Sequence, residues 1–330
     1  MTQQNNNQFG RRRFLARAAK AAACAAAAGA VAYSLYDRRG PQAGAEKDIV
    51  TLPDFLVAHK DSQVISIVTG SDRKKTINKA IELLGGIERF VKTGDVVAIK
   101  PNAAFATPPF LGATTHPDLV AEIVRLCYKS GAKKVIVTDN PINDPASCFT
   151  ISGIAKAAVQ AGAELILPRD NLFRNTTVKG GELIRDWPLY YEPFAKANKL
   201  IGISPVKDHA RAGASMSMKN WYGLMGGRRN VFHQDINKII AELAAMVKPT
   251  LVILDGTVTM MTNGPTGGSV SDLKKTNTMI ASCDMVAADA FACSLLDLKS
   301  AQLPYIALAD KSGSGVADYQ SLKPLLADVG

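Results

Sequence analysis

The chain has 330 residues and a formal net charge of +10, from 39 basic and 29 acidic side chains. Apolar residues make up 47% and charged residues 21%, ordinary globular values that exclude wholesale disorder and collagen-like or low-complexity structure. Aromatic residues make up 6%, too few for a surface that stacks single-stranded nucleic acid. Whether the charge indicates nucleic acid or a membrane surface depends on where it lies.

Most of the excess charge belongs to the first 45 residues. That segment has seven basic residues and one acidic residue, Asp37, so it carries +6 and leaves +4 for the other 285 residues. No basic stripe stands out in the rest of the chain. We therefore predict no nucleic-acid partner.

Residues 1–45 follow a recognisable order. A polar start leads into RRRFLA at 11–16 and then into a small-residue run from Ala18 to Ala32. This order resembles a twin-arginine export signal, with Arg11 and Arg12 as the pair. The run is rich in alanine and interrupted by Lys20, which predicts a poor membrane span.

The resemblance implies export to the periplasm by the twin-arginine translocase, which carries folded proteins that often hold a cofactor. Cleavage is expected after Ala32 or Ala45, each preceded by a small-x-small pattern. An uncleaved N-terminal membrane anchor and an exposed basic helix are the alternatives.

The cysteines show no metal-site spacing. There is no C-x-x-C pair and no zinc-finger or ferredoxin pattern, so we predict no iron–sulfur cluster held by this chain alone. Beyond residue 45 lie Cys127, Cys148, Cys283 and Cys293, which we expect to be buried free thiols. Disulfide bonds between these cysteines are the alternative if the compartment is oxidising.

Short apolar runs alternate with helical patterns in residues 46–330, which we predict to form a single domain. Strands are predicted over 63–69, 95–100, 134–138, 164–167, 199–204, 250–255 and 277–282, and helices over 73–91, 116–130, 154–162, 235–247 and 285–298. The alternation predicts an α/β fold, a mostly parallel sheet sandwiched by helices in Rossmann-like layers. Residues 168–198 lack periodicity and indicate a small insertion or a lid.

Ligands of open α/β sheets bind beyond the carboxyl ends of strands, and polar residues occupy several such positions here. Lys100 and Asn102 follow one predicted strand, and Asp139 follows another, where it could orient a ligand or begin a turn. Thr115 is predicted as a helix N-cap, which places His116 where free N–H groups favour anions.

The richest polar segment is residues 204–233. It contains Lys207, Asp208, His209, Lys219, Asn220, Arg228, Arg229 and His233. So many donors in one loop suit a carboxylate or phosphate, although a solvated loop is the alternative. The segment matches no standard nucleotide-binding loop.

The last candidates are three aspartates and a turn that follows the first of them. Asp255 ends a predicted strand, and Asn263 and Gly264 lie in the constrained turn that follows, an arrangement that suits a metal or a polar substrate but also simple turn capping. Asp284 is predicted to cap a helix. Asp289 falls within an apolar pattern, and a buried carboxyl needs a partner.

Several segments together resemble the family named domain of unknown function 362. They are 97–102, 112–139, 217–229, 252–268 and 283–296, in an order that runs from about Gly70 to Leu298. The resemblance implies a family but no reaction. Some relatives carry a ferredoxin-like module with four-cysteine motifs that this chain lacks. The strand-loop-helix plan is also loosely similar to lactate racemases that use a nickel-pincer cofactor, where His and Lys serve proton or hydride chemistry.

The hypothesis that follows is an exported enzyme for a small anionic substrate, with or without a metal-containing cofactor of unknown identity. His209 or His116 would be the general base or a metal ligand, Lys219 would stabilise developing negative charge, and Asp255 would orient the base or hold metal. The residues predicted to bind substrate or cofactor are Lys100, Asn102, Thr115, His116, Asp139, Lys207, Asn220, Arg228, Asn263 and Gly264. The alternatives are a non-catalytic periplasmic binding or maturation protein, and an electron-transfer accessory that needs a redox partner protein.

Overall fold

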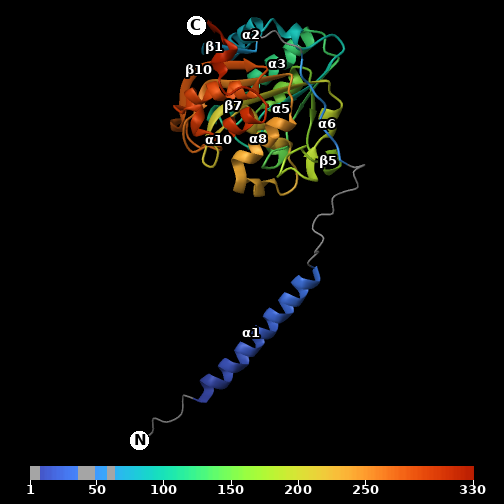
Figure 1. The fold of residues 1–330 in the computed structure, drawn as a ribbon, viewed down its shortest axis with the longest axis vertical. Helices are drawn as coiled ribbons and strands as arrows, with labels where there is room; N and C mark the ends of the chain where they lie inside the picture. Colours follow the sequence, from blue (N-terminus) through green and yellow to red (C-terminus); the bar gives the residue numbers. More distant parts are fainter. Residues whose placement is uncertain (1–7, 36–48, 58–63) are drawn as a thin grey trace. The chain divides into compact units, whose positions relative to one another are not determined.

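A computed structural model describes residues 8–35, 49–57 and 64–330 of the chain, which divides into two compact units, Met1–Gly44 and Ala45–Gly330. The first unit holds one 28-residue helix, α1 (Gln8–Leu35), drawn in blue in Figure 1. Its stretch Phe14–Val31 is long and apolar enough to cross a membrane, as a signal sequence also is. By length and composition this stretch could span a membrane, so the prediction of a poor span is wrong by these two criteria. The side chains of Arg11 and Arg12 and the cleavage position after Ala45 lie outside the described residues.

The second unit is built on a nine-stranded mixed sheet. Its strands follow the order β11-β1-β10-β9-β7-β2-β3-β4, with β8 paired to β7 alone. The strands are β1 (Ile65–Thr69), β2 (Val96–Lys100), β3 (Lys134–Thr138), β4 (Glu164–Ile166), β7 (Lys199–His209), β8 (Gly213–Ser215), β9 (Leu251–Met260), β10 (Leu273–Ser282) and β11 (Leu325–Asp328). The central pairs β9–β7, β7–β2, β2–β3 and β3–β4 are parallel, whereas β10 pairs antiparallel with β9 and β1. This arrangement confirms the predicted α/β fold.

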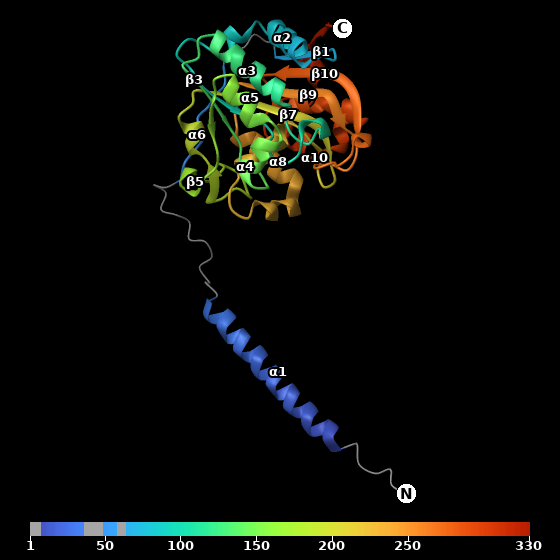
Figure 2. The same ribbon diagram turned by 180° about the vertical axis from the view of Figure 1, so that it is seen from behind.

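Helices cover both faces of this sheet (Figures 1 and 2). They are α2 (Arg73–Leu83), α3 (Pro117–Lys129), α4 (Pro145–Ile151), α5 (Ile154–Gln160), α6 (Glu192–Ala195), α7 (Ser217–Asn220), α8 (Ile236–Met246), α9 (Met285–Ala292) and α10 (Pro304–Lys311). One apolar core joins α2, α3 and α5 to residues such as Ile99, Ile201 and Ile253. The other core joins the helices α7, α8, α9 and α10 to strand residues such as Ala98 and Leu200. Alternate residues of each strand thus supply two separate cores, as the pleat requires.

The predicted elements are mostly present, with differences at their ends. Helix α2 stops at Leu83 rather than continuing to 91, because Gly85 and Gly86 adopt φ values of 100° and 84°, which glycine tolerates best. Strands β7 and β9 run several residues beyond their apolar cores, and the added residues of β7 pair with β8. The extra length of β7 brings Lys207 and His209 into a strand.

The segment predicted as an insertion or lid has its own small sheet. Strands β5 (Phe173–Thr176) and β6 (Trp187–Tyr190) form an antiparallel hairpin that leads into α6. Tyr190 and Phe194 are fully buried in the core beneath the main sheet. The segment is therefore anchored in the body of the domain, which does not fit a lid.

Strand register decides on which face each polar residue lies. Lys100 of β2 is in register with Gly202 of β7, and Gly202 is in register with Val252 of β9. Paired residues of neighbouring strands point to the same face, and successive residues alternate. Asp255 lies three positions after Val252, so its side chain points to the face opposite that of Lys100.

Candidate functional site

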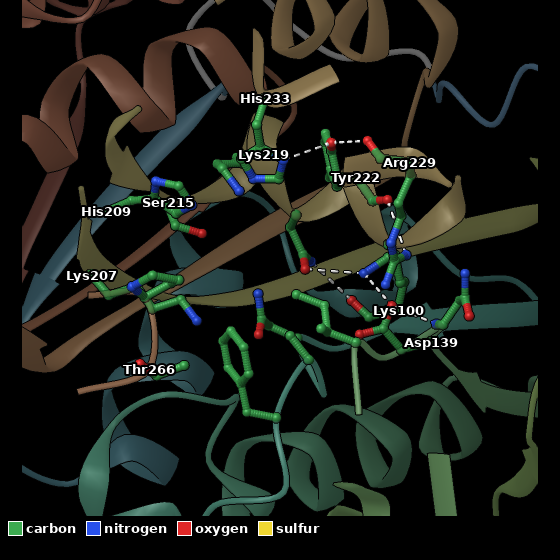
Figure 3. A pocket seen from close by; sticks show the side chains of 18 residues that line it. Lys100, Asp139, Lys207, His209, Ser215, Lys219, Tyr222, Arg229, His233 and Thr266 are labelled. Atoms are coloured by element: carbon green, nitrogen blue, oxygen red, sulfur yellow. Dashed lines mark hydrogen bonds and ion pairs between the residues drawn. The ribbon is translucent and has the colours of Figure 1, made fainter. Parts of the chain in front are cut away.

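A cavity of about 180 Å³ lies beyond the carboxyl ends of β2, β3 and β7 (Figure 3). The helix α7 and the short helices η5 (Trp221–Leu224) and η6 (Arg229–Asp235) complete its wall. We call it the cationic pocket. Its polar lining consists of Lys100, Asn102, Asp139, Asn140, Lys207, His209, Ser215, Lys219, Asn220, Tyr222, Arg229, His233 and Thr266. Seven of the residues predicted from the sequence meet here: Lys100, Asn102, Asp139, Lys207, His209, Lys219 and Asn220.

Lys100 and Asp139 form a buried ion pair at the floor of the pocket. Lys100 Nζ lies 2.6 Å from Asp139 Oδ1 and also donates to the carbonyl of Pro101 and to Asn220 Oδ1, both at 3.1 Å. Burial lowers the pKa of Lys100, and the Asp139 charge opposes that fall. Asp139 also accepts from the backbone N–H of Ala103. All three ammonium protons of Lys100 have partners, so no N–H group of Lys100 is left for the ligand binding predicted from the sequence. The residue instead shapes the floor of the pocket.

Lys207 and Lys219 have fewer hydrogen-bond and ion-pair partners than Lys100. Lys207 is almost fully buried, donates to the carbonyl of Ala113 at 2.5 Å and lies over the Phe105 ring. Burial, together with the nearby charge of Lys219, lowers the pKa of Lys207 to about 7. Lys219 Nζ lies 5.1 Å from the centre of the Tyr222 ring, and it has no hydrogen-bond or ion-pair partner within the described part of the chain. Burial and then the charge of Arg229 lower the pKa of Lys219 to about 8.

His209 is held as a neutral donor. Its Nδ1 accepts from the backbone N–H groups of Arg211 and Ala212, both at 3.2 Å, so the ring carries its proton on Nε2. Burial and then the charge of Lys219 lower the pKa of His209 to about 3. A neutral imidazole whose free nitrogen is already protonated is poorly placed to take a proton. The geometry therefore replaces the predicted general base with a hydrogen-bond donor.

Three further lining residues form a connected group to which the sequence assigned no catalytic or binding role. The Tyr222 hydroxyl donates to the carbonyl of Arg229 and lies 3.1 Å from His233 Nδ1. Arg229 in turn donates to the carbonyls of Met225 and Pro141. Arg229 and His233 lie in the donor-rich segment 204–233, but Arg228 was the arginine predicted to bind a ligand. The structure leaves Arg228 exposed and turns Arg229 into the pocket.

The two predicted asparagines differ in how they are used. Asn220 accepts from Lys100 and is part of the floor. Asn102 is 7% exposed, and its Oδ1 has no hydrogen-bond partner. A buried acceptor without a partner is uncommon and costs free energy, so Asn102 Oδ1 is available to a ligand donor.

Asp255 and His116 lie apart from the cationic pocket. They line a second cavity of about 390 Å³ on the other face of the sheet, together with Arg73, which we call the Asp255 pocket. Arg73 Nε donates to Asp255 Oδ2 at 2.6 Å, and Asp255 Oδ1 accepts from the N–H of Thr257. Asp255 therefore has no contact with His209, and the prediction that it orients that base is wrong.

The start of α3 also differs from the prediction. His116, not Thr115, is the N-cap residue, and its Nδ1 accepts from the N–H of Asp118. Thr115 is buried, accepts from the N–H of Asn102 and donates to the carbonyl of Ile203. It ties the loop after β2 to β7 and does not line either pocket.

The turn after β9 lies at the rim of the cationic pocket. The side-chain N–H of Asn263 donates to Asp272, and the backbone N–H of Gly264 donates to Asp208. Both predicted residues thus hold the turn, while the next residues, Pro265 and Thr266, line the pocket.

Asp284 caps α9 as predicted, because its side chain accepts from the N–H groups of Val286 and Ala287. Asp289 is fully buried and finds its partners in the N–H groups of Ser217 and Met218 at the start of α7. Burial raises the pKa of Asp289 to about 8. Through this contact, α9 positions the short helix that carries Lys219.

No metal centre is assembled by the residues that the structure describes. Among them, no three His, Cys, Asp or Glu side chains lie close enough to hold a metal ion, so the suggested metal roles of His209, His116 and Asp255 do not fit their surroundings. Cys127, Cys148 and Cys293 are buried free thiols as predicted, and Cys283 is partly buried and free. We derive no metal-dependent step for these groups.

These features define an α/β protein with a cationic pocket at the carboxyl ends of a mostly parallel sheet. The chain belongs to the family described as Domain of unknown function (DUF362), which matches residues 97–294.

A relative of this chain is the thylakoid-associated protein sll1697 of Synechocystis sp., which is 26% identical over 251 residues, 72% of this chain and 74% of that one. Two solved structures match parts of the chain. The lactate racemase apoprotein of Thermoanaerobacterium thermosaccharolyticum matches with a TM-score of 0.36 at 12% identity over 72% of this chain. A protein of Thermotoga maritima matches with a TM-score of 0.33 at 13% identity over 57% of it. The chain spans 57% and 50% of the lengths of those two structures.

Proposed function

We propose that this protein is an enzyme that binds a small anionic substrate in the cationic pocket and performs acid–base chemistry on it. The observation that carries the proposal is a charge imbalance. Lys207, Lys219 and Arg229 line the cavity, and Asp139, the one carboxylate among its described lining residues, is already paired with Lys100. Buried charges are normally paired, so the imbalance favours an anionic ligand as the missing partner.

The donors of the pocket suit a carboxylate or phosphate group. Lys219 has all its N–H groups free and Lys207 has two, and hydrogen bonds from such cations to an anion are short and strong. The cavity of about 180 Å³ is smaller than the roughly 300–1,000 Å³ of sites for drug-sized molecules, which favours a compact substrate.

Two features support catalysis rather than binding alone. Lys207 and Lys219, with pKa values lowered to about 7 and about 8, can gain or lose a proton near neutral pH. The Nε2–H of neutral His209 can donate to a substrate oxygen that gains negative charge, a form of electrostatic stabilisation. A non-catalytic binding protein would use the same anion-binding groups without turnover.

The test is calorimetric titration of the purified protein with phosphate, acetate, oxalate and pyruvate at pH 6.5. Lys219→Met should weaken binding of the best ligand by about 10- to 100-fold, since a hydrogen bond to a charged group is worth about 1.5–3 kcal/mol. Lys133→Met, which removes an exposed lysine outside the pocket, is the matched control and should bind normally. Equal affinity of all three proteins would rule out the pocket as the anion site. Turnover of the bound ligand, followed by NMR, separates an enzyme from a binder.

We also propose that α1 directs export through the twin-arginine translocase. The proposal rests on the order of residues 11–32 and on a helix whose stretch Phe14–Val31 is long and apolar enough for a signal or an anchor. The name of the thylakoid-associated relative agrees with a membrane association. Fusing residues 1–60 to a reporter tests it: export should be lost when Arg11 and Arg12 are both replaced by lysine. Unchanged export would contradict the twin-arginine route.

A further inference from the structure

We infer that the substrate of the cationic pocket is a small 2-oxo acid, and that Lys219 forms an imine with its carbonyl carbon. The inference rests on the proposed anion-binding function and adds the class of substrate and a covalent step. It is carried by differences among the lysines of the pocket and by the groups that surround Lys219.

Lys219 is the lysine whose amine is free to attack. The Nζ atoms of Lys100 and Lys207 are 2.6 Å from a carboxylate oxygen and 2.5 Å from a carbonyl oxygen, and both side chains are about 1% exposed. Lys219 is partly exposed to the cavity, and its Nζ meets only the face of the Tyr222 ring among the described residues. Attack on a carbonyl carbon needs an unengaged nitrogen, and among the three lysines that line the pocket Lys219 provides it.

The surroundings of Lys219 also favour the neutral amine. Figure 3 shows Lys219 among His209, His233 and Tyr222, with Lys207 and Arg229 on the other walls of the pocket. No carboxylate among the described residues pairs with it, and burial and Arg229 lower its pKa to about 8. A lysine in a desolvated pocket beside other cations is a recognised way to make an amine nucleophilic.

The same pocket can hold both ends of a 2-oxo acid. Lys207 has two N–H groups left for the carboxylate. The Nε2–H of neutral His209 is the donor available to the carbonyl oxygen, where it would polarise the carbon that Lys219 attacks. Tyr222 and His233, whose OH and Nδ1 atoms are 3.1 Å apart, lie beside the amine as proton carriers.

The step balances without any further reagent. The nitrogen of Lys219 forms a bond to the carbonyl carbon, and the resulting carbinolamine loses its oxygen as water. Both protons of that water come from the neutral amine, and a C=N bond replaces the C=O bond. Nothing is oxidised or reduced.

The experiment is reductive trapping. The full-length protein is incubated with pyruvate or glyoxylate and sodium cyanoborohydride, and the adduct is measured by intact mass and located by peptide mapping. We expect one reduced adduct per chain, on Lys219, formed equally in the Lys133→Met control. Lys219→Arg should keep the positive charge and the binding of oxalate but lose the adduct. Adducts spread over exposed lysines, or an unchanged yield in Lys219→Arg, would overturn the inference.

The two proposals fail separately. If no adduct forms on Lys219 while oxalate still binds in a Lys219-dependent manner, the imine is wrong and the anion-binding function stands. If oxalate and phosphate binding do not depend on Lys219 either, both proposals fall. Circular dichroism of Lys219→Arg establishes that its loss of adduct is not a loss of fold.

Discussion

The two pockets on opposite faces of the sheet contain similar residue types but handle charge differently. In the Asp255 pocket, Arg73 Nε and Asp255 Oδ2 lie 2.6 Å apart, so the arginine has its counter-charge. In the cationic pocket, Lys219 has no carboxylate partner among the described residues, and the carboxylate of Asp139 belongs to Lys100. Polar residues at strand ends occur in both places. What distinguishes a ligand site here is a buried excess of one sign of charge.

The ion pairs of the two pockets also differ in burial. Both have an N–O distance of 2.6 Å, but the side chains of Lys100 and Asp139 are 1% and 3% exposed, whereas Arg73 is 21% exposed and Asp255 4%. A charge that loses its partner deep inside a protein cannot be rehydrated, while a partly exposed one can. Removing a carboxyl group should therefore cost far more stability in the cationic pocket.

The largest effect is expected for Asp139→Ala. It leaves the ammonium group of Lys100 buried without a counter-charge, which should lower the free energy of unfolding by about 3–5 kcal/mol in urea titrations. The double variant Lys100→Met/Asp139→Leu removes both charges and should recover much of that loss. A single variant as stable as the parent would show that the buried pair is not what holds the pocket floor.

A smaller effect is expected for Gly223→Ala. Its added methyl carbon would lie 2.4 Å from Asp139 Oδ1 and 2.8 Å from Lys100 Nζ, so the ion pair must shift. Overpacking of this kind costs about 1–3 kcal/mol in thermal or urea unfolding, and anion affinity should fall as well. Gly268→Ala is the matched control, because no atom lies within 4 Å of the position that its methyl carbon would take. Equal stability of the two variants would contradict the tight packing of the pocket floor.

The sequence predicted the layers of the fold better than the membership of the site. Hydrophobic periodicity identifies β3 with its observed ends and places Lys100 and Asp139 near the carboxyl ends of strands. The pairing of strands is a long-range property, and only the register of β2, β7 and β9 reveals that Asp255 faces away from Lys100. For this reason the predicted catalytic group was divided between two faces of one sheet.

Local sequence patterns also could not predict which residue of a loop faces the pocket or what role it has there. Arg228 and Arg229 are neighbours with the same charge, and the conformation of η6 alone decides that the second lines the pocket. His209 was predicted as a base from its residue type. Its role depends on two backbone N–H groups of the turn after β7, which fix the neutral tautomer.

A third prediction concerns pH and sharpens the difference between the pockets. Folding lowers the pKa of Lys207 to about 7 and of Lys219 to about 8, so from about pH 7 to pH 10.5 the unfolded chain holds more protons and apo stability should rise with pH. Anion binding favours the protonated lysines, so affinity should fall by about tenfold per pH unit for each required proton.

Calorimetry at several pH values in buffers of different ionisation enthalpy measures that proton uptake. His209 and His233, whose pKa values are lowered by burial, and Arg229, which stays protonated, should contribute no change above pH 7. Affinity that is constant between pH 6 and pH 9 would argue against these lysines as ligands of the anion.

The smallest effect is expected for Asp255→Asn. The new side chain still accepts from the N–H of Thr257 through its oxygen, and Arg73, which is 21% exposed, can turn its guanidinium to water. Loss of a partly exposed pair should cost about 1 kcal/mol or less, and anion affinity should equal that of the parent protein. Anion affinity reduced as far as in Lys219→Met would mean that the two faces act as one site. Urea unfolding and calorimetry on the same preparation decide between these results, since strand register places Asp255 away from the cationic pocket.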